Sequence, residues 1–355
     1  MKIENLGLTN FRNYENKEIN FSSLVTLFYG NNGTGKTNLL EALYLSSVGR
    51  SPRTTHDQYM IRRGMDSASV RVGFYRRETS QQIRVELHTN SLKKVELNNT
   101  PIRQKELVNT LQTVFFGPDD LELIKGAPQK RRRFIDLCLS RANPIYYDTL
   151  LKYNRIIRHR NTLLKEKRVN ELDPWDEQLA TLSVYLTKER INAFSIWNHR
   201  LEKMMKELTQ EKMKVNLKYI RPYSRENDVS ENDYLQLLKA SREKDSLYGY
   251  TSIGPHRADF VFYHDDVDLA KYGSQGEQRL AVLAVKMSEI DFLQEHVGEK
   301  PVLLLDDVLS ELDPLRQQAL LSWTQNHEIQ LIMTTSYLPE TVKIKEADIR
   351  AMETI

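Results

Sequence analysis

The sequence predicts an α/β protein in which a mainly helical lobe interrupts the α/β domain. An apolar run at residues 24–29 ends at Gly30 and is followed by apolar positions at helical spacing, which is typical of a buried strand, a glycine turn and a helix. Apolar runs at residues 302–305 and 330–333 have the same strand character. Between these two ends, over residues 119–245, helical spacing replaces strand-like alternation.

The domain boundaries follow from this change of pattern. Residues 1–118 and 246–355 are predicted to form one split α/β domain, lobe I, and residues 119–245 an inserted, mainly helical lobe II. Apolar positions in residues 150–164 recur in threes, fours and sevens, and Pro174 suits the first turn of a further long helix. These helices are too short to form a long coiled-coil arm.

The N-terminal part of lobe I has a pattern of its own. Residues 1–6 alternate like a strand, and similar alternation returns at residues 70–74, 83–87 and 95–97. The polar separators between these stretches favour turns, which predicts an antiparallel meander. A run at residues 113–116 predicts one more strand. The sheet structure of lobe I is therefore predicted to be mixed, with an antiparallel N-terminal portion.

The composition is that of an ordinary globular protein. Of its 355 residues, 40% are apolar and 28% charged, and no apolar run approaches the length of about 18 residues that spans a bilayer. The single cysteine, Cys138, excludes an intramolecular disulfide and favours a reducing, cytoplasmic location. The net charge is only +3, yet residues 121–170 contain 13 Lys and Arg against 4 Asp and Glu. This asymmetry favours a polyanionic partner, with a solvated helical face as the alternative.

The glycine turn fits the pattern of a phosphate-binding loop, in which a glycine and four further residues precede Gly-Lys-Thr. Glycines let the backbone curl so that its N–H groups point at phosphate oxygens, and the following helix adds its positive end. Lys36 is predicted to reach the β- and γ-phosphates, and Thr37 to bind Mg²⁺. The predicted ATP-binding residues are Gly30, Asn31, Asn32, Gly33, Thr34, Gly35, Lys36 and Thr37.

A phosphate loop needs an acidic partner, and the strand at residues 302–305 supplies one at its carboxyl end. Asp306 is predicted to hold Mg²⁺ through water, and Asp307 to orient or deprotonate the attacking water. The predicted cofactors are therefore ATP and Mg²⁺, and Asp307 and Lys36 are catalytic candidates. The alternative is that two acidic residues merely end a strand.

A long amphipathic helix is predicted to open with Ser274, Gln275, Gly276, Glu277 and Gln278. Its Ser-x-Gly start exposes N–H groups and a hydroxyl that suit an anion, although an ordinary capped helix has the same pattern. The order of this helix, the acid-ended strand and residues 310–313 resembles the ABC-type ATPases. That resemblance implies a dimer in which Ser274 acts in trans on the partner's nucleotide, with Ser310 and Asp313 as D-loop residues.

Further motifs narrow the resemblance. Residues 8–14, 30–33, 251–259, 305–307 and 310–313 are similar to the bacterial RecF family of SMC-like DNA-repair ATPases. The resemblance implies a recombination mediator that dimerises with ATP and binds duplex, single-stranded and gapped DNA irrespective of sequence. It also implies that RecO and RecR are partners in loading RecA at gaps or stalled forks, in repair, replication restart and the SOS response.

Several positions depart from the general ABC pattern. Asp307 stands where most ABC heads carry glutamate, and Thr334, Thr335 and Ser336 stand where many carry a switch histidine. A hydroxyl can bind a γ-phosphate but is a poor general base, and no obvious Q-loop glutamine lies near residues 116–118. These departures predict a weak ATPase in which ATP acts as a switch, and the resemblance implies that DNA stimulates it.

Basic residues of lobe II are the candidate DNA contacts, because Lys and Arg give salt-sensitive, sequence-independent affinity for phosphates. An ordinary helix surface is the alternative. These candidates are Lys130, Arg131, Arg132, Arg133, Arg155, Arg158 and Arg160. Arg12 is predicted either to contact a phosphate or to form a surface salt bridge. His256 and Arg257 follow a tight Gly-Pro turn and are predicted either to hold a lobe boundary together or to have an interface or nucleotide-sensing role.

Other functions share part of these features. A transporter ATPase subunit and a chromosome-organising motor would have the same loop and signature, and a small-molecule P-loop kinase would have the loop alone. The basic insertion argues against a transporter, and the lack of long helical arms argues against a motor. Residues 274–278 have no purpose in a kinase.

Overall fold

The computed structural model describes residues 1–209, 213–221, 223, 230–338 and 347–352. The chain divides into two compact units. The first contains residues 1–120, 207–210 and 282–355, and the second residues 121–206 and 211–281.

The division differs from the predicted boundaries on one side of the insertion. The predicted boundary after residue 118 lies close to the observed one after residue 120, whereas residues 246–281 group with the second unit. The reason is that β10 (Asp259–His264) pairs along its whole length with β9 (Val215–Ile220), inside that unit.

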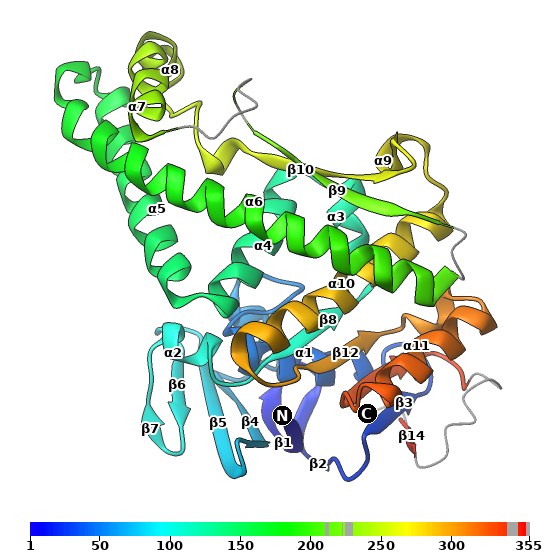
Figure 1. Ribbon diagram of the computed structural model, residues 1–355. Coiled ribbons are helices and arrows are strands. Elements are labelled where there is room, and N and C mark those ends of the chain that lie inside the picture. Colours follow the sequence, from blue (N-terminus) through cyan, green and yellow to red (C-terminus); the bar gives the residue numbers. More distant parts are fainter. Residues whose placement is uncertain (210–212, 222, 224–229, 339–346, 353–355) are drawn as a thin grey trace. The chain divides into compact units, whose positions relative to one another are not determined.

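The first unit contains an antiparallel sheet in the order β2-β1-β4-β5-β6-β7. It confirms the meander that the sequence predicts (Figure 1). The strands are β1 (Lys2–Phe11), β2 (Tyr14–Asn20), β4 (Ser67–Arg76), β5 (Thr79–His88), β6 (Lys94–Leu97) and β7 (Thr100–Pro101).

A second sheet of the first unit has the order β14-β3-β13-β12-β8, and every neighbouring pair in it is parallel. Because the pairs are parallel, the carboxyl ends of β3, β13 and β12 lie at one edge. The strands are β3 (Val25–Tyr29), β8 (Thr113–Phe116), β12 (Val302–Asp306), β13 (Leu331–Thr335) and β14 (Asp348–Ala351).

Helix α1 (Lys36–Val48) follows β3 and contacts both sheets of the first unit. A helix covered on two sides must be apolar around most of its circumference, and nearly all of α1 is buried. Its Leu39, Leu40 and Leu43 join residues of both sheets in one hydrophobic core. The other helices assigned wholly or mostly to this unit are α2 (Gln104–Val108), α10 (Gln275–Val297) and α11 (Pro314–Asn326).

The second unit is mainly helical and carries a small antiparallel sheet in the order β11-β10-β9, with β11 at Val267–Asp268. Its helices are α3 (Glu122–Lys125), α4 (Pro128–Ala142), α5 (Pro144–Lys165), α6 (Asp173–Thr209), α7 (Glu231–Ala240), α8 (Arg242–Tyr248) and α9 (Leu269–Tyr272). Short 3₁₀ helices of the chain lie at Asp57–Met60, Pro118–Leu121, Val169–Glu171, Pro255–Arg257 and Leu309–Glu311.

His256 is a partly buried contact within the second unit, which favours the structural role over nucleotide sensing. Its Nδ1 lies 2.5 Å from the Tyr153 hydroxyl and its Nε2 lies 3.0 Å from the Thr251 carbonyl oxygen. The neutral ring satisfies both contacts when Nε2–H donates and Nδ1 accepts. The pKa of His256 is lowered from 6.5 to about 4, mainly by burial and in part by the nearby guanidinium groups of Arg257, Arg132 and Arg190.

This lowered pKa predicts that the protein loses stability in mild acid. Between pH 6.5 and 4 the unfolded chain binds a proton at His256 that the folded chain excludes, so the free energy of unfolding falls as the pH drops through that window. The loss from this group is at most about 3 kcal/mol. Urea unfolding at pH 7 and pH 5 should show a larger loss for the wild type than for His256→Gln, which cannot titrate. Equal losses in the two proteins would exclude this group as the cause.

Candidate nucleotide site and basic surface

The loop between β3 and α1 has the backbone shape of a phosphate cradle. Gly30 and Gly33 adopt φ values of 147° and 86°, which residues with a Cβ rarely adopt. The backbone of Met352, at the end of β14, lies against the start of the loop, and its N–H donates to the Tyr29 carbonyl oxygen at 2.7 Å. A Cβ atom on Gly30 would lie 2.4 Å from the Met352 carbonyl oxygen.

We therefore expect Gly30→Ala to destabilise the first unit by about 1–3 kcal/mol and to weaken ATP binding, because strain and a backbone clash coincide. Gly33→Ala is the matched control, since position 33 also has a positive φ but a Cβ atom there would meet nothing within 4 Å. Urea unfolding and ATP titration should show the larger losses for Gly30→Ala. Equal losses would mean that the contact with Met352 is unimportant.

Lys36 folds back across the loop. Its Nζ donates to the carbonyl oxygens of Gly30 and Asn31, each at 2.7 Å. Burial lowers the pKa of the Lys36 amine, while the carboxylates of Asp307 and Asp306 oppose that shift. The amine is therefore held at the mouth of the cradle, where a phosphate oxygen can replace the carbonyl oxygens.

Thr37 and Asp306 meet at the carboxyl edge of the parallel sheet. The Thr37 hydroxyl donates to Asp306 Oδ1 at 2.8 Å, and the Thr334 hydroxyl donates to the same oxygen at 2.7 Å. Burial raises the pKa of Asp306. A hydroxyl and a carboxylate side by side are the hard oxygen ligands that Mg²⁺ prefers, so these residues fit that ion.

Asp307 has a left-handed backbone, with φ 54°. Its N–H donates to the Thr334 carbonyl and hydroxyl oxygens, both at 3.1 Å, and its Oδ1 accepts from the Ser336 N–H at 3.2 Å. The Ser310 hydroxyl donates to the Asp307 carbonyl oxygen at 2.6 Å. These bonds fix Asp307 beside β13 and bring the predicted D-loop serine to it.

Two other predicted residues of the first unit have local partners. Asp313 caps α11, accepting from the Arg316 N–H at 2.9 Å. The predicted phosphate contact Arg12 instead donates to both carboxylate oxygens of Glu41, at 2.8 and 2.6 Å, and to the Tyr59 carbonyl oxygen. Arg12 therefore forms a salt bridge, as the alternative predicts, but with a buried carboxylate and not at the surface.

Glu41 is a functional candidate that the motif search misses. It is fully buried on α1, one turn beyond the phosphate loop, and its carboxylate also accepts from the Ser51 hydroxyl at 2.5 Å. Arg53 lies 3.5 Å from the same carboxylate and donates to Asn38 at 2.9 Å. The signal in the sequence is an acidic residue inside an otherwise apolar helical pattern. This carboxylate holds two arginines beside the start of α1.

The predicted signature residues open α10. Ser274 and Glu277 form a reciprocal cap, in which the Ser274 N–H and hydroxyl donate to the Glu277 carboxylate at 2.7 and 2.8 Å. Ser274, Gln275 and Gly276 are exposed. Gln278 is buried, and its amide donates to the Leu269 and Gly273 carbonyl oxygens. An exposed helix start therefore remains as the candidate anion site, and Gln278 supports it from within.

Several candidate DNA contacts are engaged inside the second unit. Arg131 and Arg160 are buried: Arg131 pairs with Asp259 at 2.7 Å, and Arg160 pairs with two aspartates. The prediction that these two contact DNA is wrong, because their guanidinium groups are buried in ion pairs inside the unit and not exposed at its surface. Arg132 donates to the Ala258 carbonyl oxygen, and Lys130 pairs with Glu122. Arg133, Arg155 and Arg158 remain exposed, without an ion pair to any described residue.

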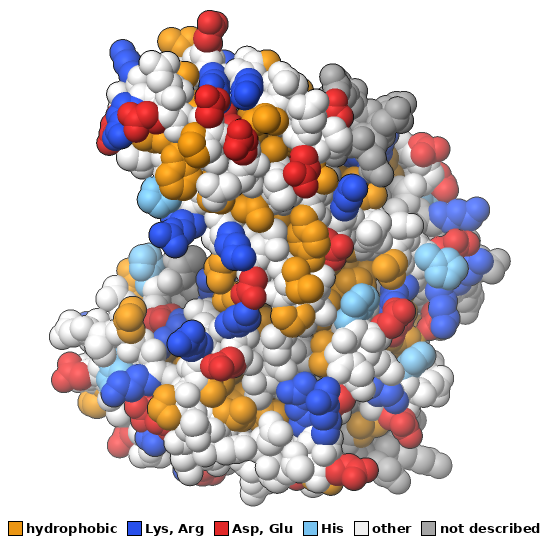
Figure 2. All heavy atoms as spheres, turned by 60° about the vertical axis from the view of Figure 1, so that its left-hand side comes forward, with side chains coloured by type: hydrophobic (Ala, Val, Ile, Leu, Met, Phe, Trp, Pro, Cys, Tyr) orange, Lys and Arg blue, Asp and Glu red, His pale blue; other side chains and the backbone are white. Residues whose placement is uncertain are grey.

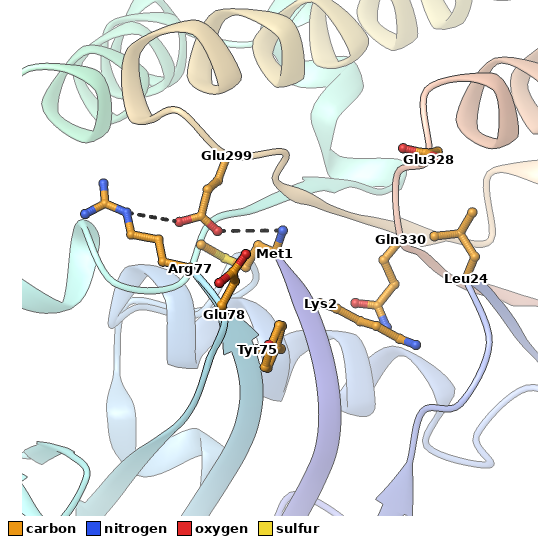
Figure 3. Close-up of a pocket in the computed structure, with 9 residues that line it drawn as sticks. All are labelled: Met1, Lys2, Leu24, Tyr75, Arg77, Glu78, Glu299, Glu328 and Gln330. Carbon is orange, nitrogen blue, oxygen red and sulfur yellow. Dashed lines mark ion pairs between the residues drawn. The ribbon is translucent and has the colours of Figure 1, made fainter.

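A pocket of about 350 Å³ lies elsewhere on the first unit, and Figure 3 shows its lining. Leu24 and Gln330 directly precede β3 and β13, so the pocket lies at the amino edge of the parallel sheet, opposite the phosphate loop. Glu299 projects into it and pairs with the Met1 amine at 3.7 Å and with Arg77 at 3.5 Å (Figure 3). It is therefore distinct from the candidate nucleotide site.

Two absences hold for the part of the chain that the structure describes. None of its helices combines the length and apolar character needed to cross a bilayer. No group of three or more His, Cys, Asp or Glu residues there could hold a metal ion.

Comparisons with known proteins agree with this arrangement. The family model for the RecF/RecN/SMC N terminal domain matches residues 2–351. The chain is 39% identical over 354 residues to a DNA replication and repair protein RecF of Clostridium perfringens strain SM101, covering 97% of each chain. It is 40% identical over 349 residues to a protein of the same name from Agathobacter rectalis, covering 97% of this chain and 94% of the relative.

Solved structures also match this chain, and a RecF structure is among them. A structure of the recombination mediator RecF with ATP in the RecFOR pathway matches with a TM-score of 0.88 and 32% identity, over 96% of this chain and 94% of that one. An SMC head bound to the C-terminal winged-helix domain of ScpA matches with a TM-score of 0.56 and 18% identity, over 95% of this chain and 90% of that one. The second match supports the ABC-type head fold alone.

Proposed function

Because the chain belongs to the RecF family of DNA replication and repair proteins, we propose that it is an ATP-dependent, DNA-binding recombination mediator. The observation that carries the proposal is the meeting of Lys36, Thr37 and Asp306 at the carboxyl edge of one parallel sheet. A related RecF, 32% identical, has been solved with ATP, which supports ATP as the nucleotide here.

ATP would bind along residues 30–37, with the N–H groups of the loop and the Lys36 amine on its phosphates. Thr37 and Asp306 are the residues that would hold Mg²⁺, which offsets phosphate charge when bound. Asp307 would orient the attacking water. The Asp307 side chain is shorter than glutamate, and its carboxylate already accepts a hydrogen bond from the Ser336 N–H. Thr334 offers a hydroxyl where many ABC heads have a histidine, and a hydroxyl is a poor general base. Hydrolysis is therefore proposed to be slow, and its stimulation by DNA is a further proposal that rests on membership of the family.

The exposed start of α10 supports a dimer in which each chain completes the other's site. Ser274 and the neighbouring N–H groups would cap the γ-phosphate held by the partner copy. The Ser274–Glu277 cap gives this helix start a fixed shape before a phosphate arrives. ATP would thus act as a switch for dimerisation.

DNA would be bound through exposed cations of the second unit. Arg133, Arg155 and Arg158 carry this proposal, because each is exposed and lacks a carboxylate partner among the described residues. The contacts are to phosphates, so affinity would be independent of sequence and would fall steeply with salt.

The cellular role follows from the family. The related solved RecF belongs to the RecFOR pathway, so RecO and RecR are the proposed partners. Loading of RecA at single-strand gaps and stalled forks, with consequences for replication restart and the SOS response, is the proposed outcome. Since bacterial chromosomes lie in the cytoplasm, this function places the protein there.

Lys36→Ala tests the switch. Light scattering with and without ATP and gapped DNA, at two salt concentrations, should show ATP-dependent dimers and DNA complexes for the wild type and neither for Lys36→Ala. Lys17→Ala, at an exposed lysine of β2, is the control and should behave as the wild type. If Lys36→Ala still dimerised and held DNA in an ATP-dependent way, the switch scheme would be wrong.

A further inference from the structure

Two tyrosines are displayed together on the surface of the second unit, where α8 ends. Gly249 follows the helix with φ 69°, and this left-handed turn places Tyr248 and Tyr250 on the same side. Their rings are nearly parallel, with 5.6 Å between centroids and 15° between planes. Tyr248 is 58% exposed and Tyr250 is 40% exposed. Single exposed apolar side chains are common, whereas exposed apolar groups that adjoin one another are typical of interaction sites.

A guanidinium group extends this stack. Arg257 Cζ lies 4.5 Å from the centroid of the Tyr250 ring, and its Nε donates to the Thr251 carbonyl oxygen at 3.1 Å. Arg257 and Tyr248 thus both lie close to the Tyr250 ring, and the 58% exposed Tyr248 leaves ring surface for a further planar group. Because the three side chains already hold one another, little conformational entropy is left to lose when that group binds.

The stack continues a strip of unpaired cations. Arg155, Arg158 and Lys165 are exposed on α5 at spacings of three and seven residues, which keeps them on one side of the helix over about 15 Å. None of the three has an ion pair with a described residue. The aliphatic part of Lys165 lies against Gly249, since a Cβ atom there would be 3.1 Å from Lys165 Cγ. Figure 2 shows Lys and Arg side chains interspersed with hydrophobic and acidic ones on the part of the surface that carries α7 and α8.

We propose that Tyr248, Tyr250 and Arg257 form a platform on which an unpaired DNA base stacks, while the adjoining phosphates lie along Arg155, Arg158 and Lys165. Every base presents a π-face, so aromatic rings bordered by cations bind single strands without reading their sequence. The positive charge of the strip favours a polyanion over an apolar peptide as the occupant. This inference rests on the proposed DNA binding and deepens it, because it names unpaired nucleotides as the part of the DNA that this surface recognises.

The test compares three labelled DNAs in the presence of Mg²⁺ and a slowly hydrolysed ATP analogue. One is a short blunt duplex, the second carries a single-stranded thymidine tail, and the third carries an abasic tail with the same phosphates. Fluorescence anisotropy should show that the wild type prefers the thymidine tail over the abasic tail by about 10- to 100-fold. Tyr248→Ala with Tyr250→Ala should remove this preference without changing binding to the blunt duplex.

Matched variants separate stacking from charge. Tyr248→Phe with Tyr250→Phe keeps the rings and should keep the preference, and the unchanged duplex binding of the alanine variant shows that its loss is not a loss of folding. Arg155→Ala with Arg158→Ala should weaken the binding of all three DNAs by the same factor and reduce the salt dependence of affinity. The tyrosine variants should leave that salt dependence unchanged.

Two results overturn the platform alone: equal binding of both tails by the wild type, or an undiminished preference in the alanine variant. An undiminished preference in the alanine variant is also the result expected if these rings contact a protein partner instead. Failure of the wild type to bind any of the three DNAs would overturn the proposed function and the platform with it.

Discussion

Asp307→Asn is expected to slow ATP hydrolysis by about 10²- to 10⁴-fold while ATP-dependent dimerisation and DNA binding persist. Asparagine cannot accept the proton of the attacking water. It can retain the structural contacts, because its Oδ1 can accept from the Ser336 N–H as Asp307 does at 3.2 Å. Asparagine is also among the few residues that adopt a left-handed backbone readily, and position 307 has φ 54°. The variant should therefore trap the ATP-bound state.

Phosphate release measures the rate of hydrolysis, and sizing in the presence of ATP measures dimerisation. The matched control is Asp265→Asn, the same substitution at an exposed residue that also has a left-handed backbone, φ 45°. Asp265→Asn should leave the rate of phosphate release and the dimer content unchanged. Hydrolysis by Asp307→Asn within about tenfold of the wild type would mean that another group activates the water.

Arg160→Ala is expected to lower the free energy of unfolding by about 3–5 kcal/mol. Arg160 is fully buried and pairs with Asp176 and Asp245, each at 2.7 Å, and it also donates to the Thr251 hydroxyl. Removing the guanidinium leaves two buried carboxylates without their shared counter-ion. Arg242 retains Asp176 at 2.7 Å, so the uncompensated charge falls mainly on Asp245.

Urea unfolding followed by far-UV circular dichroism would measure this loss. Arg158→Ala, two residues earlier on the exposed side of α5, should change the free energy of unfolding by no more than about 0.5 kcal/mol. Conversely, Arg158→Ala should weaken DNA binding, and Arg160→Ala should do so only in proportion to the unfolded fraction. If Arg160→Ala instead weakened DNA binding without loss of stability, and Arg158→Ala lowered stability without weakening DNA binding, Arg160 would be a DNA contact.

The sequence predicted best what depends on short stretches of chain. The strands predicted at residues 24–29, 302–305 and 330–333 are observed as β3, β12 and β13, with ends shifted by no more than two residues. Apolar runs, a glycine turn and a capped helix start are local signals. Because parallel strands share one carboxyl edge, these signals also place Lys36 near Asp306 and Asp307.

Other features depend on pairings between distant residues, which no local pattern reveals. Residues 246–281 grouped with the second unit because β10 pairs with β9. The run of basic residues predicts Arg131 and Arg160 as DNA contacts. Their carboxylate partners are Asp259 for Arg131 and Asp176 and Asp245 for Arg160, and these are distant in sequence, so the run does not reveal them. Arg12 was ambiguous for the same reason, since its partner Glu41 lies on another element.

The strand order of the parallel sheet has a consequence for how the protein is made. β3, which leads into the phosphate loop, is translated early, but its two neighbours in the sheet are β13 and β14. While the chain emerges from the ribosome, β3 can pair with neither of them until residues 331–335 and 348–351 have been added. Chains build their N-terminal domains first during synthesis, and here the loop must wait for the distant strands. A nascent chain stalled before β14 would thus carry the phosphate loop with one edge of its supporting strand uncovered, and nucleotide binding would follow the synthesis of both neighbouring strands.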